Sequence, residues 1–411
     1  MNNKKSAPGK KSLSRRNFLK TTTAATAAFT IIPGVAMGRK LGYQAPSDTL
    51  NIVLIGAGNQ GSSGDGVRQA CSWAWAGEIG EVRKVDVWSS RPIWPQGLDT
   101  PTELMKVPKT LDWNLWIAHM PFRPYNSAYH PWNFRGWWDF GTGAFGDMAC
   151  HNMHPVFKVL QLGYPVKVQG QSTTLKKDAC PHAQIVKMIF PARLNLPKMA
   201  LPEVEVTWYD GGFHAMIPEV LPEGKKWEGE GCALYGTKDT LVLGSHGTNP
   251  YLLSGRTPKT PEVLRVVPNN NHYLDWVNAC KNPDLLDKTA SHFNEAGPFN
   301  EIVLMGVLAV RVQKIGKILE WDGPSMQFTN ISGDEKVSTW SELFDIGKMM
   351  AAANAAAKTA GGGGQSKGAP AASFPGMPGY EDPSARNAKE FVSSLVKHEY
   401  LNGFKLPDIP A

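Results

Sequence analysis

Three alternating stretches, VKVQGQSTT (166–174), AQIVKMIFPAR (183–193) and VEVTWYDGG (204–212), decide the fold class of this 411-residue chain. Each alternates apolar and polar side chains with a period of two, which is typical of half-buried β-strands. Turn-rich segments separate them, and two further candidates follow, ALYGTKDTLVLG (233–244) and YLLSG (251–255). The pattern predicts an open, largely antiparallel sheet.

Helical patterns lie on both sides of these strands. Residues 143–160 precede the strands, and two helices are expected after them, near 271–281 and over 299–314. The last of these is strongly apolar and is therefore expected in the core. An Ala- and Gly-rich segment, 351–379, predicts a low-complexity linker before a C-terminal tail, 380–411.

A different pattern precedes the sheet region. LNIVLIG (50–56) is typical of a buried parallel strand, a glycine loop follows, and a helix over 65–78 leads to a second strand over 81–90. A glycine loop between a strand and a helix indicates dinucleotide binding, because backbone amides at the helix start hold the pyrophosphate. The candidate cofactor-binding residues are Gly56, Gly58, Asn59, Gln60 and Gly61.

This β-α-β unit is too short for a complete nucleotide domain. Such a domain has two β-α-β-α-β halves and an acid about 20 residues after the glycine loop. Only one unit precedes a region rich in Pro, Trp and Tyr, and no acid stands in a fitting turn. The sequence therefore predicts an α/β (α+β) chain: a truncated Rossmann-like remnant over 50–90, then a substrate domain over 91–345 with helices on one face of its sheet.

The first 42 residues form a separate basic leader. They hold nine of the 43 Lys and Arg residues and no acid, so 34 basic and 36 acidic residues remain, which does not indicate nucleic-acid binding. SRRNFLK (14–20) and the mildly apolar stretch after it are typical of a cleaved twin-arginine signal rather than a stable membrane span. We expect the twin-arginine translocation (Tat) machinery as a partner and a periplasmic location.

The five cysteines do not indicate a metal centre. No CxxC spacing occurs, and the neighbouring pairs Cys150 with His151 and Cys180 with His182 supply too few ligands for zinc. We therefore expect no metal.

Five long motifs carry a family resemblance. They are GNQGSSGDGVRQACSWAWAGEIGEV (58–82), SRPIWPQGL (90–98), LDWNLWIA (111–118), RPYNSAYHPWNFRGWWDFGTGAFGDMACH (123–151) and EIVLMGVLAVRVQKIGKILEWD (301–322). With them the chain resembles the glucose–fructose oxidoreductase / inositol dehydrogenase / MocA (Gfo/Idh/MocA) family, in particular its exported twin-arginine branch. The resemblance implies bound NAD or NADP and a homo-oligomer. It also implies that most of the N-terminal Rossmann domain is missing here, including the ribose-binding acid and a Glu-Lys-Pro motif whose lysine serves in catalysis.

Asp147 and His151 are the candidate catalytic pair. Their spacing of four residues places them on one face of the predicted helix. Removal of hydride from an alcohol needs a base that titrates near neutral pH, and a neighbouring carboxylate can orient a histidine in that role. The resemblance implies that both lie beside the nicotinamide, with His151 as acid/base. Judged by spacing alone, a surface ion pair is the alternative.

A cluster of rings and polar side chains surrounds this pair in sequence. Aromatic faces stack on the apolar faces of sugars, and interleaved Arg and His can bond hydroxyls. The alternative is that these rings pack an irregular loop against the sheet. The candidate substrate-binding residues are Arg135, Trp137, Trp138, Tyr129, His130 and His154.

Together these observations predict an exported oxidoreductase-family protein that acts on a sugar or cyclitol hydroxyl by NAD(P)-dependent hydride transfer. The alternative is a catalytically impaired sugar-binding or oligomerising protein that has lost its nucleotide domain. Redox-neutral glycoside cleavage with catalytic NAD is a third reading, and it needs the same lost domain.

Overall fold

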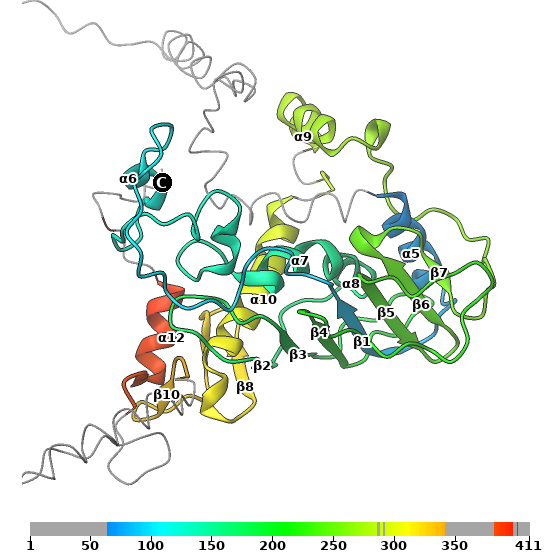
Figure 1. Cartoon of the computed structure of the whole chain (residues 1–411). Coiled ribbons are helices and arrows are strands. Elements are labelled where there is room, and N and C mark those ends of the chain that lie inside the picture. Colours follow the sequence, from blue (N-terminus) through cyan, green and yellow to red (C-terminus); the bar gives the residue numbers. More distant parts are fainter. Residues whose placement is uncertain (1–63, 286–287, 291, 342–381, 398–400, 402–411) are drawn as a thin grey trace, which may run out of the picture. The chain divides into compact units, whose positions relative to one another are not determined.

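The computed structural model describes residues 64–285, 288–290, 292–341, 382–397 and 401 (Figure 1). The predicted export signal, the glycine loop 56–61 and the linker 351–379 lie outside the described residues. Of the described chain, residues 107–116 belong to one compact unit, and all others belong to a second unit. In the first, the rings of Trp113 and Trp116 stack with centroids 4.8 Å apart.

The second unit is built on a sheet with nine strands in its described part, in the order β7-β6-β5-β1-β4-β3-β2-β8-β9. Every neighbouring pair is antiparallel except β1 and β4, which are parallel. The prediction of a mixed α/β fold with a largely antiparallel sheet is thereby confirmed. The strands are β1 (Val82–Trp88), β2 (Lys167–Ser172), β3 (Gln184–Phe190), β4 (Val204–Tyr209), β5 (Gly231–Gly236), β6 (Thr240–Gly244), β7 (Tyr251–Leu252), β8 (Leu319–Asp322) and β9 (Gln327–Phe328).

Strand β1 lies in the middle of this sheet. Val85 is paired with Val206 of β4 on one side and with Leu234 of β5 on the other. Both edges of β1 are therefore occupied by β4 and β5, and the strand expected over 50–56 lies outside the described residues. The strand that the sequence assigned to a nucleotide-binding remnant is instead a central strand of the large sheet, because its backbone pairs with substrate-domain strands on both edges.

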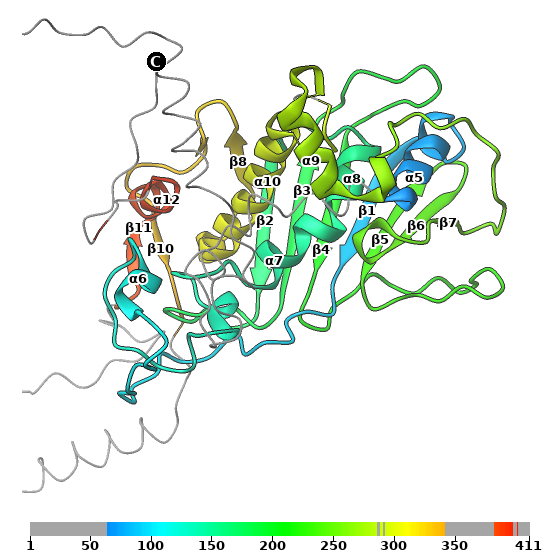
Figure 2. The same ribbon diagram turned by 90° about the horizontal axis from the view of Figure 1, so that it is seen from above.

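Helices cover one face of the sheet (Figures 1 and 2). The helix expected over 143–160 is divided at Met153, and the apolar helix expected from 299 begins six residues earlier. These helices are α5 (Asp65–Trp75), α7 (Gly143–Asn152), α8 (His154–Val159) and α10 (Phe293–Arg311), and α9 (His272–Lys281) precedes α10 in the chain.

Helix α10 packs closely on β2 and β3, because two glycines leave room for it. A Cβ atom on Gly170 of β2 would lie 2.5 Å from the backbone nitrogen of Val310. A Cβ on Gly306 of α10 would lie 2.3 Å from the ring of Phe145 in α7. Ile302 and Val310 are fully buried, so this helix lies in the core as its apolar sequence predicts.

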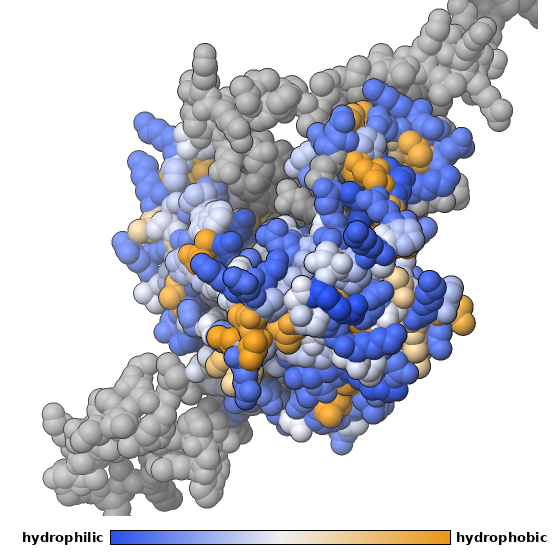
Figure 3. Space-filling view, turned by 90° about the vertical axis from the view of Figure 1, so that its right-hand side faces the viewer, coloured by the Kyte–Doolittle hydropathy of each residue, from blue (hydrophilic) through white to orange (hydrophobic). Residues whose placement is uncertain are grey.

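A smaller apolar cluster lies apart from the main core, around Trp88 of β1, Ala233 of β5 and Val242 of β6. Trp227, from the segment before β5, stacks on Trp88 with centroids 4.7 Å apart. The end of the molecule that faces right in Figure 1 is mainly hydrophilic, with apolar residues in small separate patches (Figure 3).

The C-terminal segment adds a short two-stranded sheet of β10 (Lys336–Ser338) and β11 (Ala385–Asn387), followed by α12 (Ala388–Val396). The side chain of Asn387 caps α12 by accepting a hydrogen bond from the backbone nitrogen of Glu390. None of the described helices is long and apolar enough to cross a membrane.

Candidate functional site

Helix α7 carries both candidate catalytic residues. Its start depends on Gly143, which has a left-handed φ of 68° and whose Cβ, if it had one, would lie 2.8 Å from Cβ of Cys180. A side chain would be strained there, so glycine allows the chain to turn into the helix. At its other end, Asn152 donates a hydrogen bond of 3.0 Å to the carbonyl of Trp88, which ties α7 to the end of β1.

Asp147 forms an ion pair with Arg135 rather than with His151. Nε of Arg135 donates to Oδ1 of Asp147 over 3.1 Å, and the guanidinium lies 4.2 Å from the ring centroid of Trp132. Burial raises the pKa of Asp147 above its usual value, although Arg135 acts in the opposite direction. Among the described residues no hydrogen bond joins Asp147 to His151, so the orienting role expected for Asp147 is replaced by a pairing with Arg135.

His151 is half-buried, and its Nδ1 atom is buried with no hydrogen-bond partner in the described part of the chain. Burial, helped by the neighbouring His246, lowers its pKa to about 4. The two imidazole rings lie with centroids 4.3 Å apart. His151 is therefore neutral at neutral pH and can accept a proton.

A polar network at the end of β1 supports this histidine pair. Its centre is Glu230, whose Oε1 accepts hydrogen bonds from Nε of Arg91 at 2.9 Å and from the hydroxyls of Ser89 and Ser90. Oε2 of Glu230 lies 3.0 Å from the Ser245 hydroxyl. Burial acts to raise the pKa of Glu230, but Arg91 and these hydroxyls outweigh it, so the pKa is lowered and the group is a carboxylate.

The same network holds His246 in an uncommon backbone conformation. Its φ is 60°, a left-handed value that non-glycine residues rarely adopt. The backbone nitrogen of His246 donates to Oδ1 of Asn152 at 3.2 Å, and Nδ1 lies 2.8 Å from the Ser245 hydroxyl. Sequence reasoning missed Glu230, Ser245 and His246, because they follow no motif and come from loops far from α7 in the chain.

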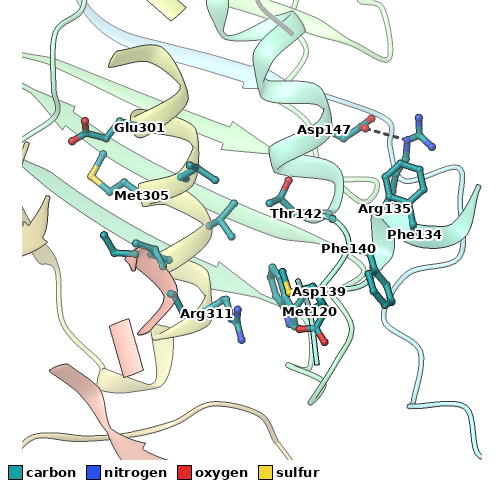
Figure 4. A pocket seen from close by; sticks show the side chains of 18 of the residues that line it. Met120, Phe134, Arg135, Asp139, Phe140, Thr142, Asp147, Glu301, Met305 and Arg311 are labelled. Atoms are coloured by element: carbon teal, nitrogen blue, oxygen red, sulfur yellow. Dashed lines mark hydrogen bonds and ion pairs between the residues drawn. The ribbon is translucent and has the colours of Figure 1, made fainter. Parts of the chain in front are cut away.

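A pocket of about 460 Å³ opens next to Asp147, and His151, His246 and Glu230 do not line it (Figure 4). Asp147 and Arg135 form part of its wall, and Trp138 and Arg311 line it as well. The remaining lining comes from the segment over 119–143, from α10, from Trp321 and Met326, and from the end of α12. Asp147 therefore stands between the pocket and the polar network around Glu230, whose charge contributes to its pKa.

The other predicted substrate residues do not all line this pocket. Trp137 is 1% exposed and donates from Nε1 to the carbonyl of Ala128 at 2.7 Å. The ring of Tyr129, 3% exposed, meets Trp137 edge-on at 4.8 Å. These two rings pack the loop, as the alternative interpretation proposed, whereas Trp138 lines the pocket. His130 is half-buried and does not line this pocket.

His154 lies in the core. It is 1% exposed, and its Nε2 atom is 2.9 Å from Oε1 of Glu295. The rings of Phe157 and Phe299 contact it from two sides. It therefore ties α8 to α10 and does not line the pocket that Asp147 and Trp138 share. As for metals, the described residues contain no group of three or more His, Cys, Asp or Glu that could hold an ion.

Comparison with known proteins agrees with this architecture. Residues 82–193 match the Gfo/Idh/MocA "oxidoreductase family, C-terminal alpha/beta domain", and residues 12–31 match the signal sequence of the twin-arginine translocation pathway. The signal implies the Tat machinery as a partner and export by that route. No curated protein matches the chain.

Similar solved structures include two super-repressor mutants of Gal80p from Saccharomyces cerevisiae, with 13% and 12% identity and TM-scores of 0.33. Each alignment covers 64% of this chain and 63% of Gal80p. A protein of Bacteroides fragilis, provisionally assigned as an oxidoreductase, has 10% identity and a TM-score of 0.27, over 61% of this chain and 62% of that one. The chain thus spans less than two thirds of the length of these structures. The matched domain begins at β1 and contains α7, so residues 82–193 are similar to the C-terminal α/β domain of the Gfo/Idh/MocA oxidoreductase family, and residues 12–31 are similar to a twin-arginine export signal.

Proposed function

We propose that this protein is an exported oxidoreductase that acts on a sugar or cyclitol hydroxyl by NAD(P)-dependent hydride transfer. The observation that carries the proposal is His151, a half-buried imidazole that stays neutral and lies on the same helix as Asp147. Asp147 and Arg135 form the adjoining pocket wall, so a hydroxyl-bearing ligand has charged and polar groups to orient it.

In the proposed reaction, His151 takes the proton of the substrate hydroxyl. Because Nδ1 is buried, we propose Nε2 of the half-buried ring as the acceptor. His246 and Arg91 disfavour a positive charge on His151, while Glu230 favours it. The ring is thus uncharged before the proton moves, and Glu230 then partly offsets the charge that develops.

Nicotinamide supplies the hydride acceptor when it is bound. Two observations support the substrate end of such a site: the buried Nδ1 of His151 has no partner among the described residues, and Asp147, on the same helix, lines the pocket. They include no phosphate-binding loop, because the candidate loop 56–61 lies outside them. Gly56, Gly58, Asn59, Gln60 and Gly61 therefore remain the proposed cofactor-binding residues.

The export signal supports a periplasmic site of action, and the twin-arginine route carries folded proteins, so cofactor would be loaded before export. We propose a homo-oligomer as well, on the family resemblance.

A titration of the purified mature chain with NADH and NADPH, followed by nicotinamide fluorescence, tests the proposal. Saturable binding at micromolar concentrations is expected, followed by turnover in a screen of sugars and cyclitols. Absence of binding up to millimolar concentrations would contradict NAD(P)-dependent hydride transfer.

One observation favours the second candidate, a catalytically impaired sugar-binding protein. β1 is enclosed by β4 and β5, so the segment over 50–90 contributes its second strand to the substrate domain rather than to a nucleotide fold. This candidate predicts sugar binding that is unchanged by NADH and NADPH, and no turnover.

A further inference from the structure

The pocket contains a cation that none of its own acids neutralises. Arg311 is the last residue of α10 and is half-buried, and Figure 4 shows its side chain among those that line the pocket. Its guanidinium lies 4.9 Å from the ring centroid of Trp138 and 5.2 Å from that of Phe391. Among the described residues no carboxylate forms an ion pair or hydrogen bond with it, although Asp139 and Asp178 act on it through space.

The acids of the pocket are engaged elsewhere. Asp139 pairs with Arg123, and Asp147 pairs with Arg135. Glu301, in the middle of α10, accepts a hydrogen bond of 2.9 Å from Nε1 of Trp321. Arg311 is therefore the pocket cation with its hydrogen-bonding capacity unused by the described residues.

The surroundings of this cation are apolar. Apolar side chains that line the pocket include Trp138, Leu304, Leu308 and Leu395. A guanidinium in such surroundings is stabilised by an anion that accepts its paired N–H groups, and a carboxylate matches that fork. Because Asp139 and Glu301 also line the pocket, a singly charged anion suits it better than a doubly charged phosphate.

We propose that Arg311 binds the carboxylate of a ring-shaped ligand, such as a uronic acid or a cyclitol carboxylate, whose ring lies against Trp138. The inference rests on the proposed function, because the same pocket has Asp147 and Arg135 in its wall. It names the substrate class: an acidic rather than a neutral sugar or cyclitol. The volume of about 460 Å³ is within the usual range for small-molecule sites.

The test compares ligands on the unaltered mature protein by calorimetry or tryptophan fluorescence. D-Glucuronate is measured against D-glucuronamide, which has the same shape without the charge, and against glucose 6-phosphate. We expect glucuronate to bind at least about tenfold more tightly than either, as a charged hydrogen bond contributes. Equal affinities for the acid and the amide, tighter binding of the phosphate, or no binding of glucuronate would overturn the proposal.

Variants then locate the carboxylate. Arg311→Met should abolish the preference for glucuronate over the amide, and Arg311→Lys should retain part of it. Lys314→Met is the matched control, because it removes a positive charge from an exposed position three residues further along. Thermal unfolding checks that each variant is folded. A preference that survives Arg311→Met would contradict the assignment.

These outcomes are independent of the redox proposal, because binding is measured without a nicotinamide cofactor. A failure of the proposed function alone would leave glucuronate binding and its dependence on Arg311 intact, with no hydride transfer. A failure of the inference alone would leave turnover intact, with neutral sugars bound as tightly as acidic ones.

Discussion

His151 shows how one side chain is tuned by what surrounds it. Isolated histidines titrate near pH 6.5, but burial and His246 lower the pKa of this one to about 4. Asp147 does not counteract this shift, because its carboxylate pairs with Arg135. The base is thereby kept unprotonated over the whole neutral range.

Substitution of His151 by Asn should remove the base while keeping a polar group. If hydride transfer occurs, we expect turnover to fall about 100- to 10,000-fold, the usual contribution of a general base. His182→Asn, at an exposed position, is the control and should leave the rate unchanged. In the unaltered protein the acidic limb of kcat/KM should lie near pH 4, and a limb near pH 6.5 would show that another group is the base.

The same shift predicts a pH dependence of stability. The folded pKa of His151 lies below the unfolded value, so as the pH falls the unfolded chain takes up the proton first. The contribution of neutral His151 to the free energy of unfolding is complete above about pH 6.5. It is lost as the pH falls toward about 4, by up to about 1.4 kcal/mol per pH unit. Denaturant unfolding at about pH 7 and about pH 5 should show a smaller loss for His151→Asn than for the unaltered protein.

At the scale of elements, the position of α10 decides the shape of the pocket. The helix lies against β2 and α7 because Gly170 and Gly306 carry no side chains, and this brings the side of α10 with Leu304, Leu308 and Arg311 to the pocket. Its contact with α7 places that wall opposite Asp147. The packing that holds the core together therefore also positions the groups of the candidate site.

Gly170→Ala should disturb this packing. The added Cβ would lie 2.5 Å from the backbone of Val310, and a helix backbone cannot yield as a flexible side chain can. We expect a loss of about 1–3 kcal/mol in the free energy of unfolding, as for other overpacked cores. Gly163→Ala, where a Cβ meets nothing within 4 Å, should change it by less than about 0.5 kcal/mol. Equal effects on thermal unfolding would contradict close α10–β2 packing.

Glu295 makes a second connection between elements. Burial alone would raise its pKa, but hydrogen bonds from His154 and Lys158 of α8 lower it to about 2. The contribution of Glu295 to the free energy of unfolding is therefore complete above about pH 4.5, its pKa in the unfolded chain. This contribution is lost as the pH falls toward about 2.

Glu295→Gln should destabilise the protein by about 3 kcal/mol at neutral pH, because His154 and Lys158 lose their carboxylate partner. Glu205→Gln, which breaks an exposed pair with Lys187, should cost less than about 1 kcal/mol. Chemical denaturation of both variants measures the difference, and similar losses would show that the Glu295 cluster contributes no more than a surface pair.

On the scale of the whole molecule, the net positive charge is concentrated in the segment that carries the export signal. The basic excess lies in the leader, and the remainder of the chain is nearly neutral. Replacement of Arg15 and Arg16 by Lys should keep the leader charge but remove the twin-arginine pair. We expect the protein to accumulate in the cytoplasm, as measured by cell fractionation and immunoblotting. Export of this variant to the same extent would mean that another route carries it.

Much of the fold follows from the sequence. The period of two over 166–174, 183–193 and 204–212 predicts β2, β3 and β4, because each of these strands buries one face. The apolar run of α10 predicts a core helix, and the spacing of Asp147 and His151 places both on α7. These are local properties, which a period or a motif expresses directly.

Only the tertiary structure decided how distant segments meet. β1 lies between β4 and β5, more than 100 residues away in the chain, and no local pattern specifies such a neighbour. Trp138 lines the pocket, whereas the adjacent Trp137 is buried and packs the loop. The sequence by itself determined the elements, the export signal and the catalytic candidates. Packing decided the neutrality of His151 and the pocket around Arg311, because pKa and charge compensation depend on groups that only the folded chain brings together.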